Sequence, residues 1–214
     1  MGLFEALLGR TAVYRAIQAP FAERKLAPFL AEADLSPGRR VLDVGCGPGT
    51  NTRHFRETGY LGIDVNPRYI AHARRTYGRD FVVADVTRYE VEDAEPFDVI
   101  LANSFFHHIG DDDTDRILAH LATLLAPAGR LHVLDLVLPH GPSAAYLLAR
   151  LDRGEHPRPL EAWRELLSRH FEAETFLPYD LGVGPLAFWK MVYFKGAPLP
   201  AAPAPDPARK GEDA

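Results

Sequence analysis

Residues 41–49 read VLDVGCGPG, an apolar run that leads directly into a glycine-rich turn. Thr50, the next residue, is expected to open a helix, so this stretch predicts a buried strand, a tight turn and a helix N-terminus. A turn with almost no side-chain bulk lets a ligand lie directly against main-chain amides. The glycines Gly45, Gly47 and Gly49 are spaced more closely than in the G-x-G-x-x-G pattern of nicotinamide-binding proteins. The turn therefore predicts a ligand site, and its spacing alone leaves the kind of ligand open.

The composition limits the size and the partners of the fold. With 214 residues, of which 47% are hydrophobic and 25% charged, the chain is long enough for one well-packed domain and short for two. The net charge is −5, and the sequence contains no run of lysines or arginines. Proteins that grip a nucleic-acid backbone usually show a basic face. Nucleic acid is therefore not expected as a partner.

Cys46 is the only cysteine, so no intramolecular disulfide can form, which fits a reducing compartment. Because it lies between two glycines, we expect it to be a small buried packing residue rather than a nucleophile. The N-terminus lacks the pattern of a signal peptide, and no stretch approaches the roughly 18 apolar residues of a membrane span. The expected location is the cytoplasm. The oligomeric state is left open.

The chain divides into three expected segments. Residues 1–36 have apolar side chains at helical spacing and predict an N-terminal helical cover. This cover is either a packing layer or a lid over the ligand edge, with Tyr14 as the candidate contact. Residues 37–196 form the expected main domain. Residues 197–214, rich in proline and alanine, predict a disordered tail.

Strand-like and helix-like segments alternate from residue 39 onward, which predicts an α/β fold with a doubly wound parallel sheet. The last two strands are expected to pair antiparallel at the sheet edge. The expected strands are 40–44, 60–63, 80–84, 97–102, 130–137, 171–177 and 188–195. The expected helices are 50–58, 67–77, 112–125, one ending near 151, and 159–168, with a turn at 127–129.

Polar residues follow the expected strands at the edge where ligands bind in such sheets. Asp64 follows the second strand at a distance that suits hydrogen bonds to ribose hydroxyls. Asp85 follows the third strand, where it can accept from an adenine amine while Val86 packs on the ring. Asn103 and Ser104 end the fourth strand, opposite the reacting end of a ligand. Aspartates after strands are often only helix caps, but carboxylates in phase after successive strands favour a nucleotide-type site.

Five stretches resemble the successive motifs of class I S-adenosylmethionine-dependent methyltransferases, especially the small bacterial type 11 and ubiquinone/menaquinone-type enzymes. The stretches are Val41–Gly49, Gly62–Val65, Ala84–Val86, Phe97–Ile100 and Leu125–Arg130. The resemblance covers about residues 39–137. It implies a seven-stranded Rossmann-like sheet with a reversed last strand, S-adenosylmethionine as cofactor, and methyl transfer. The candidate cofactor-binding residues are Asp43, Gly45, Cys46, Gly47, Gly49, Asp64, Val65, Asp85, Val86, Asn103, Ser104 and Tyr14.

His107 and His108 are the candidate catalytic residues, because imidazole titrates near neutrality and can accept the proton of a hydroxyl. His107 is preferred, since it follows two aromatic residues that are expected to wall the acceptor pocket. The alternative is that one histidine packs the loop and the other is solvated. Carboxylates at 111, 112, 113 and 115 give a magnesium site as an alternative. Their position at the start of a predicted helix fits helix capping instead, so no metal is expected.

The acceptor is expected to be a small organic molecule, with O-methylation slightly favoured. Residues 103–106 read NSFF and lack the Asn/Asp-Pro-Pro-Tyr/Phe signature of enzymes that methylate nucleobase amines. The alternatives are methylation of a macromolecule such as tRNA or protein, and a non-catalytic cofactor-binding module. Arg153, His156 and Arg158 lie in a connector that either binds an anionic acceptor or is simply a solvated loop. The candidate pocket walls are Phe105, Phe106, Tyr146, Trp163, Phe188 and Trp189.

Overall fold

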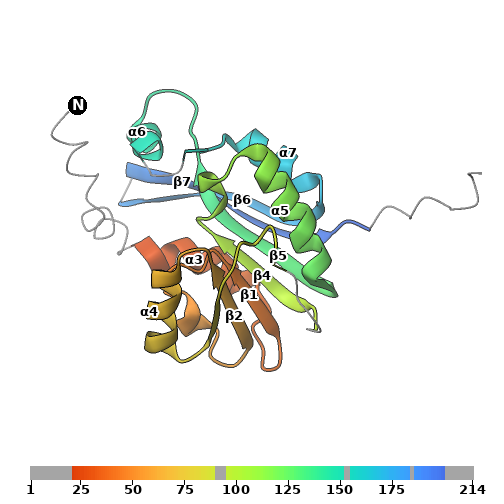
Figure 1. Ribbon diagram of the computed structural model, residues 1–214. Helices are drawn as coiled ribbons and strands as arrows, with labels where there is room; N and C mark the ends of the chain where they lie inside the picture. Colours follow the sequence, from red (N-terminus) through yellow and green to blue (C-terminus); the bar gives the residue numbers. More distant parts are fainter. Residues whose placement is uncertain (1–20, 90–94, 152–154, 184–185, 201–214) are drawn as a thin grey trace, which may run out of the picture.

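A computed structural model of the protein describes residues 21–89, 95–151, 155–183 and 186–200, which form a seven-stranded sheet covered by helices on both faces (Figure 1). The expected contact Tyr14 and most of the expected tail lie outside these residues. None of the helices in the described ranges is both long and apolar enough to cross a bilayer.

The strand order is β3-β2-β1-β4-β5-β7-β6. The first five strands are parallel, and β7 runs antiparallel to both β5 and β6. This confirms the predicted doubly wound sheet with a reversed last strand. The strands are β1 (Arg40–Val44), β2 (Gly59–Asp64), β3 (Asp80–Val83), β4 (Phe97–Asn103), β5 (Leu125–Val137), β6 (Phe171–Val183) and β7 (Leu186–Pro198).

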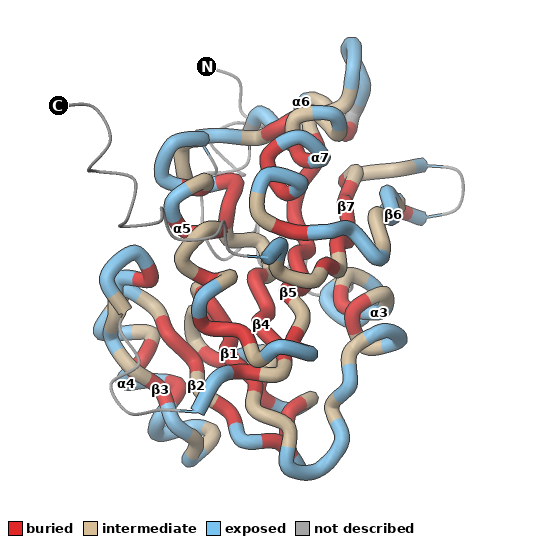
Figure 2. The backbone as a smooth tube through the Cα atoms, turned by 90° about the vertical axis from the view of Figure 1, so that its right-hand side faces the viewer, coloured by how far each residue is buried: buried red, intermediate tan, exposed pale blue. Residues whose placement is uncertain are grey.

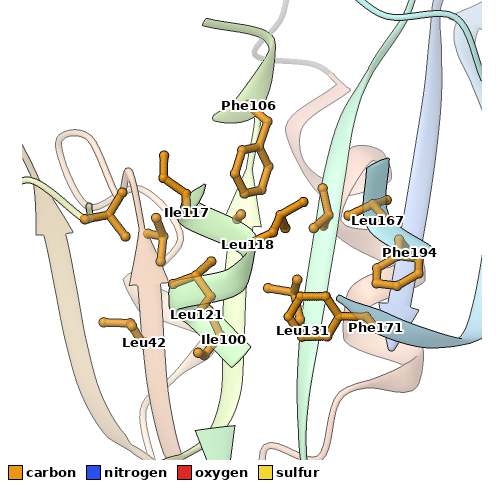
Figure 3. Close-up of a cluster of buried hydrophobic side chains, with 14 of the residues drawn as sticks. Leu42, Ile100, Phe106, Ile117, Leu118, Leu121, Leu131, Leu167, Phe171 and Phe194 are labelled. Carbon is orange, nitrogen blue, oxygen red and sulfur yellow. The ribbon is translucent and has the colours of Figure 1, made fainter. Parts of the chain in front are cut away.

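Apolar side chains on the central strands alternate between two cores, because successive residues of a strand point to opposite faces. On one face, Leu42 of β1 and Ile100 of β4 pack under α5 (Asp111–Leu124) and α7 (Leu160–Ser168), as Figure 3 shows. On the other face, their neighbours Val41 and Val99 pack with α3 (Ala22–Glu32) and α4 (Pro67–Tyr77). The buried residues run along the middle of the sheet, and the outer surfaces of the helices are exposed (Figure 2).

Helix α4 begins and ends where the sequence predicts. The side chain of Asn66 accepts from the amides of Arg68 and Tyr69, and Pro67 occupies the first turn, where its missing N–H costs nothing. Gly78 ends the helix in the left-handed conformation, with φ of 59°. The N-terminus of α4 is thereby fixed directly after Asp64, at the ligand edge of the sheet. The remaining helix, α6 (Ala144–Leu151), packs on β7.

The prediction of a helix at 50–58 is wrong. This segment contains only a short 3-10 turn, Thr52–His54, and its backbone hydrogen bonds join residues three apart. The connection between β1 and β2 is short, and its first residues form the glycine turn, so little chain remains for an α-helix. The predicted turn at 127–129 lies within β5 as an irregularity between the pairs Phe97–Leu125 and Val99–Arg130. Strand β7 reaches Pro198, two residues into the expected tail.

Candidate active site

A cleft of about 900 Å³ opens at the carboxyl ends of β1, β2, β3 and β4. It lies where strand order reverses, since β1 has β2 on one side and β4 on the other, and open α/β sheets bind ligands there. Its walls combine apolar side chains, carboxylates and the glycine turn. The lining residues are Gly45, Gly47, Ile63, Asp64, Val65, Tyr69, Ala84, Asp85, Val86, Thr87, Arg88, Ser104, Phe105, His108, Ile109, Asp113, Arg116 and Ile117.

The glycine turn leaves its backbone open to the cleft. Gly45 has a φ of 65°, and a Cβ added to it would lie 2.4 Å from Cδ2 of Phe105. Gly47 also lines the cleft, and a Cβ there would meet nothing within 4 Å. Gly49 faces away from the cleft, where a Cβ would meet Ala73, Phe81 and Tyr77 at 3.0 Å. Gly47 therefore leaves open space at the cleft, Gly45 makes room for the ring of Phe105, and Gly49 allows close packing of α4 on the sheet.

Asp64 is held at the end of β2 by two backbone amides. Its Oδ2 accepts from the N–H of Gly47 at 2.9 Å, and its Oδ1 accepts from the N–H of Asn66 at 2.7 Å. A carboxylate accepts about four hydrogen bonds, so acceptor capacity remains toward the cleft. Val65, the next residue, lines the cleft with 68% of its surface exposed, which is unusual for a valine beside a buried strand. This pair offers a polar and an apolar contact to one ligand.

Asp85 holds a similar position after β3. Its Oδ1 accepts from both the N–H and the hydroxyl of Thr87, at 2.9 and 2.8 Å, which leaves Oδ2 for other donors. These two hydrogen bonds hold the pKa of the Asp85 carboxyl below its usual value, so it is ionised at neutral pH. Val86, which is buried, lines the cleft beside it.

Four of the candidate cofactor residues do not line the cleft: Asp43, Cys46, Gly49 and Asn103. Asp43 is buried below the turn, where its Oδ2 accepts from the hydroxyl of Tyr60 at 3.0 Å. Its Oδ1 has no hydrogen-bond partner in the described part of the chain. Burial raises the pKa of Asp43 to about 7. Cys46 is buried, and burial raises the pKa of its thiol, so it has the properties of a packing residue.

Ser104 adopts a strained conformation at the end of β4, with a φ of 54°, a region that residues other than glycine rarely occupy. Its N–H donates to the carbonyl of Leu134 at 2.8 Å, which holds the strand end in place. The ammonium of Lys25, from α3, donates to the hydroxyl of Ser104. The hydroxyl of Tyr179 donates to the carbonyl of Lys25 at 2.7 Å and fixes α3 at this position. Lys25 was not among the candidates, because a single lysine in an amphipathic helix has no distinguishing sequence pattern.

The two histidines occupy different environments. His108 is exposed and lines the cleft, whereas His107 is buried and does not. The Nδ1 of His107 lies 2.5 Å from Oδ1 of Asp135, and the two imidazole rings lie 4.0 Å apart between centroids. Asp135 also accepts from the amides of Phe106 at 2.8 Å and Leu136 at 2.7 Å. Burial opposes ionisation of Asp135, but the charge and hydrogen bond of His107 outweigh it and hold its pKa below the usual value. Asp135, inside the apolar run of β5, was not among the candidates either.

Arg158 fastens the segment that carries these histidines. Its guanidinium donates to the carbonyls of Phe106 and Ile109, at 2.8 and 2.6 Å, and to the hydroxyl of Thr114 at 3.1 Å. It also pairs with Asp111 at 2.7 Å, with its side chain only 5% exposed. The guanidinium therefore makes four hydrogen bonds inside the protein, so Arg158 is not part of a solvated loop, and it does not line the cleft.

The remaining candidates are divided between the cleft and the core. Of the aromatic residues, Phe105 lines the cleft, while Phe106 and Trp163 are fully buried in the core. In the acidic run, Asp113 pairs with Arg116 and Asp115 with His170. The described residues contain no group of three His, Cys, Asp or Glu side chains placed to hold a metal ion.

The fold and the cleft are those of an α/β domain that binds a nucleotide-type cofactor at a glycine turn. Residues 41–129 match the family described as "Methyltransferase domain". Together with the strand order, this match gives residues 41–129 the sequence and the fold of a class I S-adenosylmethionine-dependent methyltransferase domain, as the motifs predict.

Curated relatives and solved structures agree with this assignment. Trans-aconitate 2-methyltransferase of Klebsiella pneumoniae (strain 342) is 34% identical over an alignment of 143 residues. The match covers 60% of this chain and 54% of that protein. The chain spans about half the length of the first curated relatives it matches. A protein of Pyrococcus horikoshii OT3 has the same fold, with a TM-score of 0.66 and 19% identity over 89% of this chain and 93% of that one. N-methyltransferase NodS of Bradyrhizobium japonicum WM9, solved with S-adenosyl-L-homocysteine, has a TM-score of 0.59 and 18% identity, covering 87% of each chain.

Proposed function

We propose that this protein transfers the methyl group of S-adenosylmethionine to a small organic molecule. The observation that carries the proposal is the meeting of Asp64 and Asp85, from the ends of adjacent strands, in one cleft beside an open glycine turn. The match of residues 41–129 to a methyltransferase domain supports it, as do relatives that are named methyltransferases.

The cleft fits this cofactor residue by residue. The free acceptor positions of Asp64 suit the two ribose hydroxyls, and the remaining oxygen of Asp85 suits the adenine amine. Val65 and Val86 provide apolar contacts for the ring. The open backbone at Gly47 leaves room for the aminocarboxypropyl arm, because no atom lies within 4 Å of a Cβ built there. At Gly45 the missing side chain instead makes room for the ring of Phe105. Ser104 then stands opposite the reacting end.

The cofactor supplies an already activated methyl group, so the protein mainly has to align the acceptor with it. Correct alignment at about 3–3.5 Å lowers the barrier by several kcal/mol. A hydroxyl acceptor must also lose its proton, and His108 is the histidine that faces the cleft. His107 lies behind it, with its ring tilted against that of His108, and is held by Asp135, so we assign His107 a positioning role. This arrangement favours O-methylation, although one structural relative is an N-methyltransferase.

The charges of the cleft favour a small acceptor over a macromolecule. Its wall carries the carboxylates Asp64, Asp85 and Asp113 and the guanidiniums Arg88 and Arg116. Arg116 is bonded to Asp113, so the described wall is not a basic surface. Methylation of tRNA would require contacts to phosphates from such a surface. The similarity to trans-aconitate methyltransferases points instead to small organic acids as the first acceptors to test.

Calorimetry with S-adenosyl-L-homocysteine tests the cofactor half of the proposal. We expect Asp64→Ala to weaken binding by at least tenfold, since charged hydrogen bonds contribute about 1.5–3 kcal/mol each. Asp80→Ala is the matched control, because Asp80 is an exposed aspartate at the opposite end of the neighbouring strand. The cofactor half is wrong if the wild type shows no binding or if both variants behave alike.

Methyl transfer is tested by incubating the protein with labelled cofactor and a panel of acids, phenols, amines and thiols, followed by mass spectrometry. A methylated small molecule supports the proposal. Cofactor binding with no transfer to any member of the panel would favour the non-catalytic module.

A further inference from the structure

A second groove, of about 680 Å³, lies at the edge of the sheet opposite the cofactor cleft. Its walls come from the first residues of four parallel strands: Arg40 of β1, Gly59 of β2, Asp80 of β3 and Phe97 of β4. The cofactor cleft lies at the carboxyl ends of the same strands. The sheet therefore separates the two sites, and the proposed methyl transfer does not use the second one.

Three arginines line this groove, and main-chain carbonyls orient them. Arg74 of α4 donates from Nε to the carbonyl of Phe81 at 2.9 Å, and one of its terminal nitrogens donates to the same oxygen. Arg79 donates to the carbonyl of Arg56 at 3.1 Å and to that of Thr58. These contacts limit the rotamers of both side chains before any ligand arrives.

The third arginine, Arg40, donates to the carbonyl of Glu95, and its guanidinium lies 5.0 Å from the centre of the Phe97 ring. In the same way, Arg79 lies 5.7 Å from the centre of the Tyr60 ring. Aromatic faces and carbonyl dipoles orient a guanidinium, but neither neutralises its charge. Since each arginine has five N–H donors, each one retains donors for a ligand.

No carboxylate within the described ranges forms an ion pair with Arg40, Arg74 or Arg79, and Asp80 is the one acidic residue among those lining the groove. Three other cations at this edge are neutralised. Arg39 pairs with Asp34 and Asp98, Arg130 with Glu174, and Lys195 with Glu32 and Glu174. In a chain with 29 acidic and 24 basic residues, this groove brings together three guanidiniums and one carboxylate.

We propose that this groove binds the phosphate group of a small phosphorylated molecule. The planar guanidinium fork matches phosphate oxygens in a bidentate manner, and charged hydrogen bonds of this kind are about twice as strong as neutral ones. The groove is larger than a phosphate ion, so its ligand carries further atoms beyond the phosphate. The net charge of −5 opposes a nucleic-acid backbone as the occupant.

Calorimetry with inorganic phosphate and pyrophosphate, at constant ionic strength set with chloride, tests the proposal. We expect wild-type protein to bind pyrophosphate more tightly than phosphate, and Arg79→Gln and Arg74→Gln each to weaken binding roughly tenfold. Arg74→Lys keeps the charge but loses the fork, and it should give an intermediate affinity. The control is Arg75→Gln, because Arg75 follows Arg74 in α4. Its side chain is exposed and forms no hydrogen bond or ion pair with the described residues.

Retained affinity for S-adenosyl-L-homocysteine in every variant shows that each one is folded. The proposal is overturned if neither anion binds at millimolar concentration, or if Arg75→Gln weakens binding as much as the groove variants do. Flotation with vesicles that contain phosphatidic acid distinguishes a lipid headgroup. Binding to such vesicles without binding to soluble pyrophosphate would overturn the assignment to a small molecule.

Discussion

Replacing Arg158 with methionine is expected to lower the free energy of unfolding by about 3 kcal/mol. The substitution removes the guanidinium donors from the carbonyls of Phe106 and Ile109 and from the hydroxyl of Thr114. The N–H of Ile109 still donates to Phe106, and the hydroxyl of Thr114 still donates to Ile109. Phe106 and Thr114 are fully buried, so water does not replace those donors. Each lost hydrogen bond to a charged group costs roughly 1.5–3 kcal/mol, so the two at these buried partners account for about 3 kcal/mol. The side chain of Asp111 is 74% exposed and becomes solvated instead, so the loss of its ion pair with Arg158 adds little to the change in stability.

The measurement is urea denaturation followed by circular dichroism, with a thermal melt in parallel. A loss of about 3 kcal/mol corresponds to a fall in melting temperature of roughly 6–12 °C for a domain of this size. Arg169→Met is the matched control, because Arg169 is 49% exposed and pairs with Glu165 on the surface. It should cost less than about 0.5 kcal/mol. If both variants lose less than about 1 kcal/mol, the guanidinium does not hold this segment in place and the reasoning fails.

Three further changes test the site. Lys25→Met should weaken the binding of S-adenosyl-L-homocysteine severalfold in calorimetry, because Lys25 brings a positive charge to Ser104. The affinity for 5′-methylthioadenosine, which lacks the carboxylate, should not change. Equal losses of affinity for both ligands would contradict this. Gly45→Ala should abolish detectable cofactor binding in the same assay, since its φ of 65° disfavours a side chain and its Cβ would displace Phe105 into the cleft; wild-type affinity would contradict it. Asp43 has a pKa raised to about 7, so between about pH 4 and 7 the folded state binds a proton that the unfolded state lacks, and stability falls as pH rises through that window. Asp43→Asn should flatten this slope in urea denaturation, and an unchanged slope would show that another group causes it.

The sheet and most of its helices followed from local patterns in the sequence. Strand β1 and helix α4 have the predicted bounds, because an apolar run, an asparagine cap and a left-handed glycine act within a few residues of each other. The helix at 50–58 was predicted wrongly, since no periodicity reveals how much chain the glycine turn uses. Strands β6 and β7 exceed their predicted length because antiparallel pairing between them extends both.

The sequence by itself determined that the main candidate cofactor residues meet at one edge of the sheet. Gly45, Asp64 and Asp85 each follow a strand, and parallel strands bring their carboxyl ends to one edge, so the order of segments already placed them together. Asp43, near the end of β1, was also a candidate cofactor residue, but tertiary packing buries it against Tyr60 and away from the cleft.

Only the tertiary structure decided which side chains complete the acceptor half. His107 and His108 are adjacent in the sequence, and only the contact of His107 with Asp135, 28 residues later, shows which of them faces the cleft. Lys25 reaches Ser104 across 79 residues, and Arg158 reaches Phe106 across 52. Contacts of this length depend on how helices and loops pack over the sheet. Hydrophobic periodicity specifies the sheet itself, but it contains no information on the partner that a given polar side chain will meet.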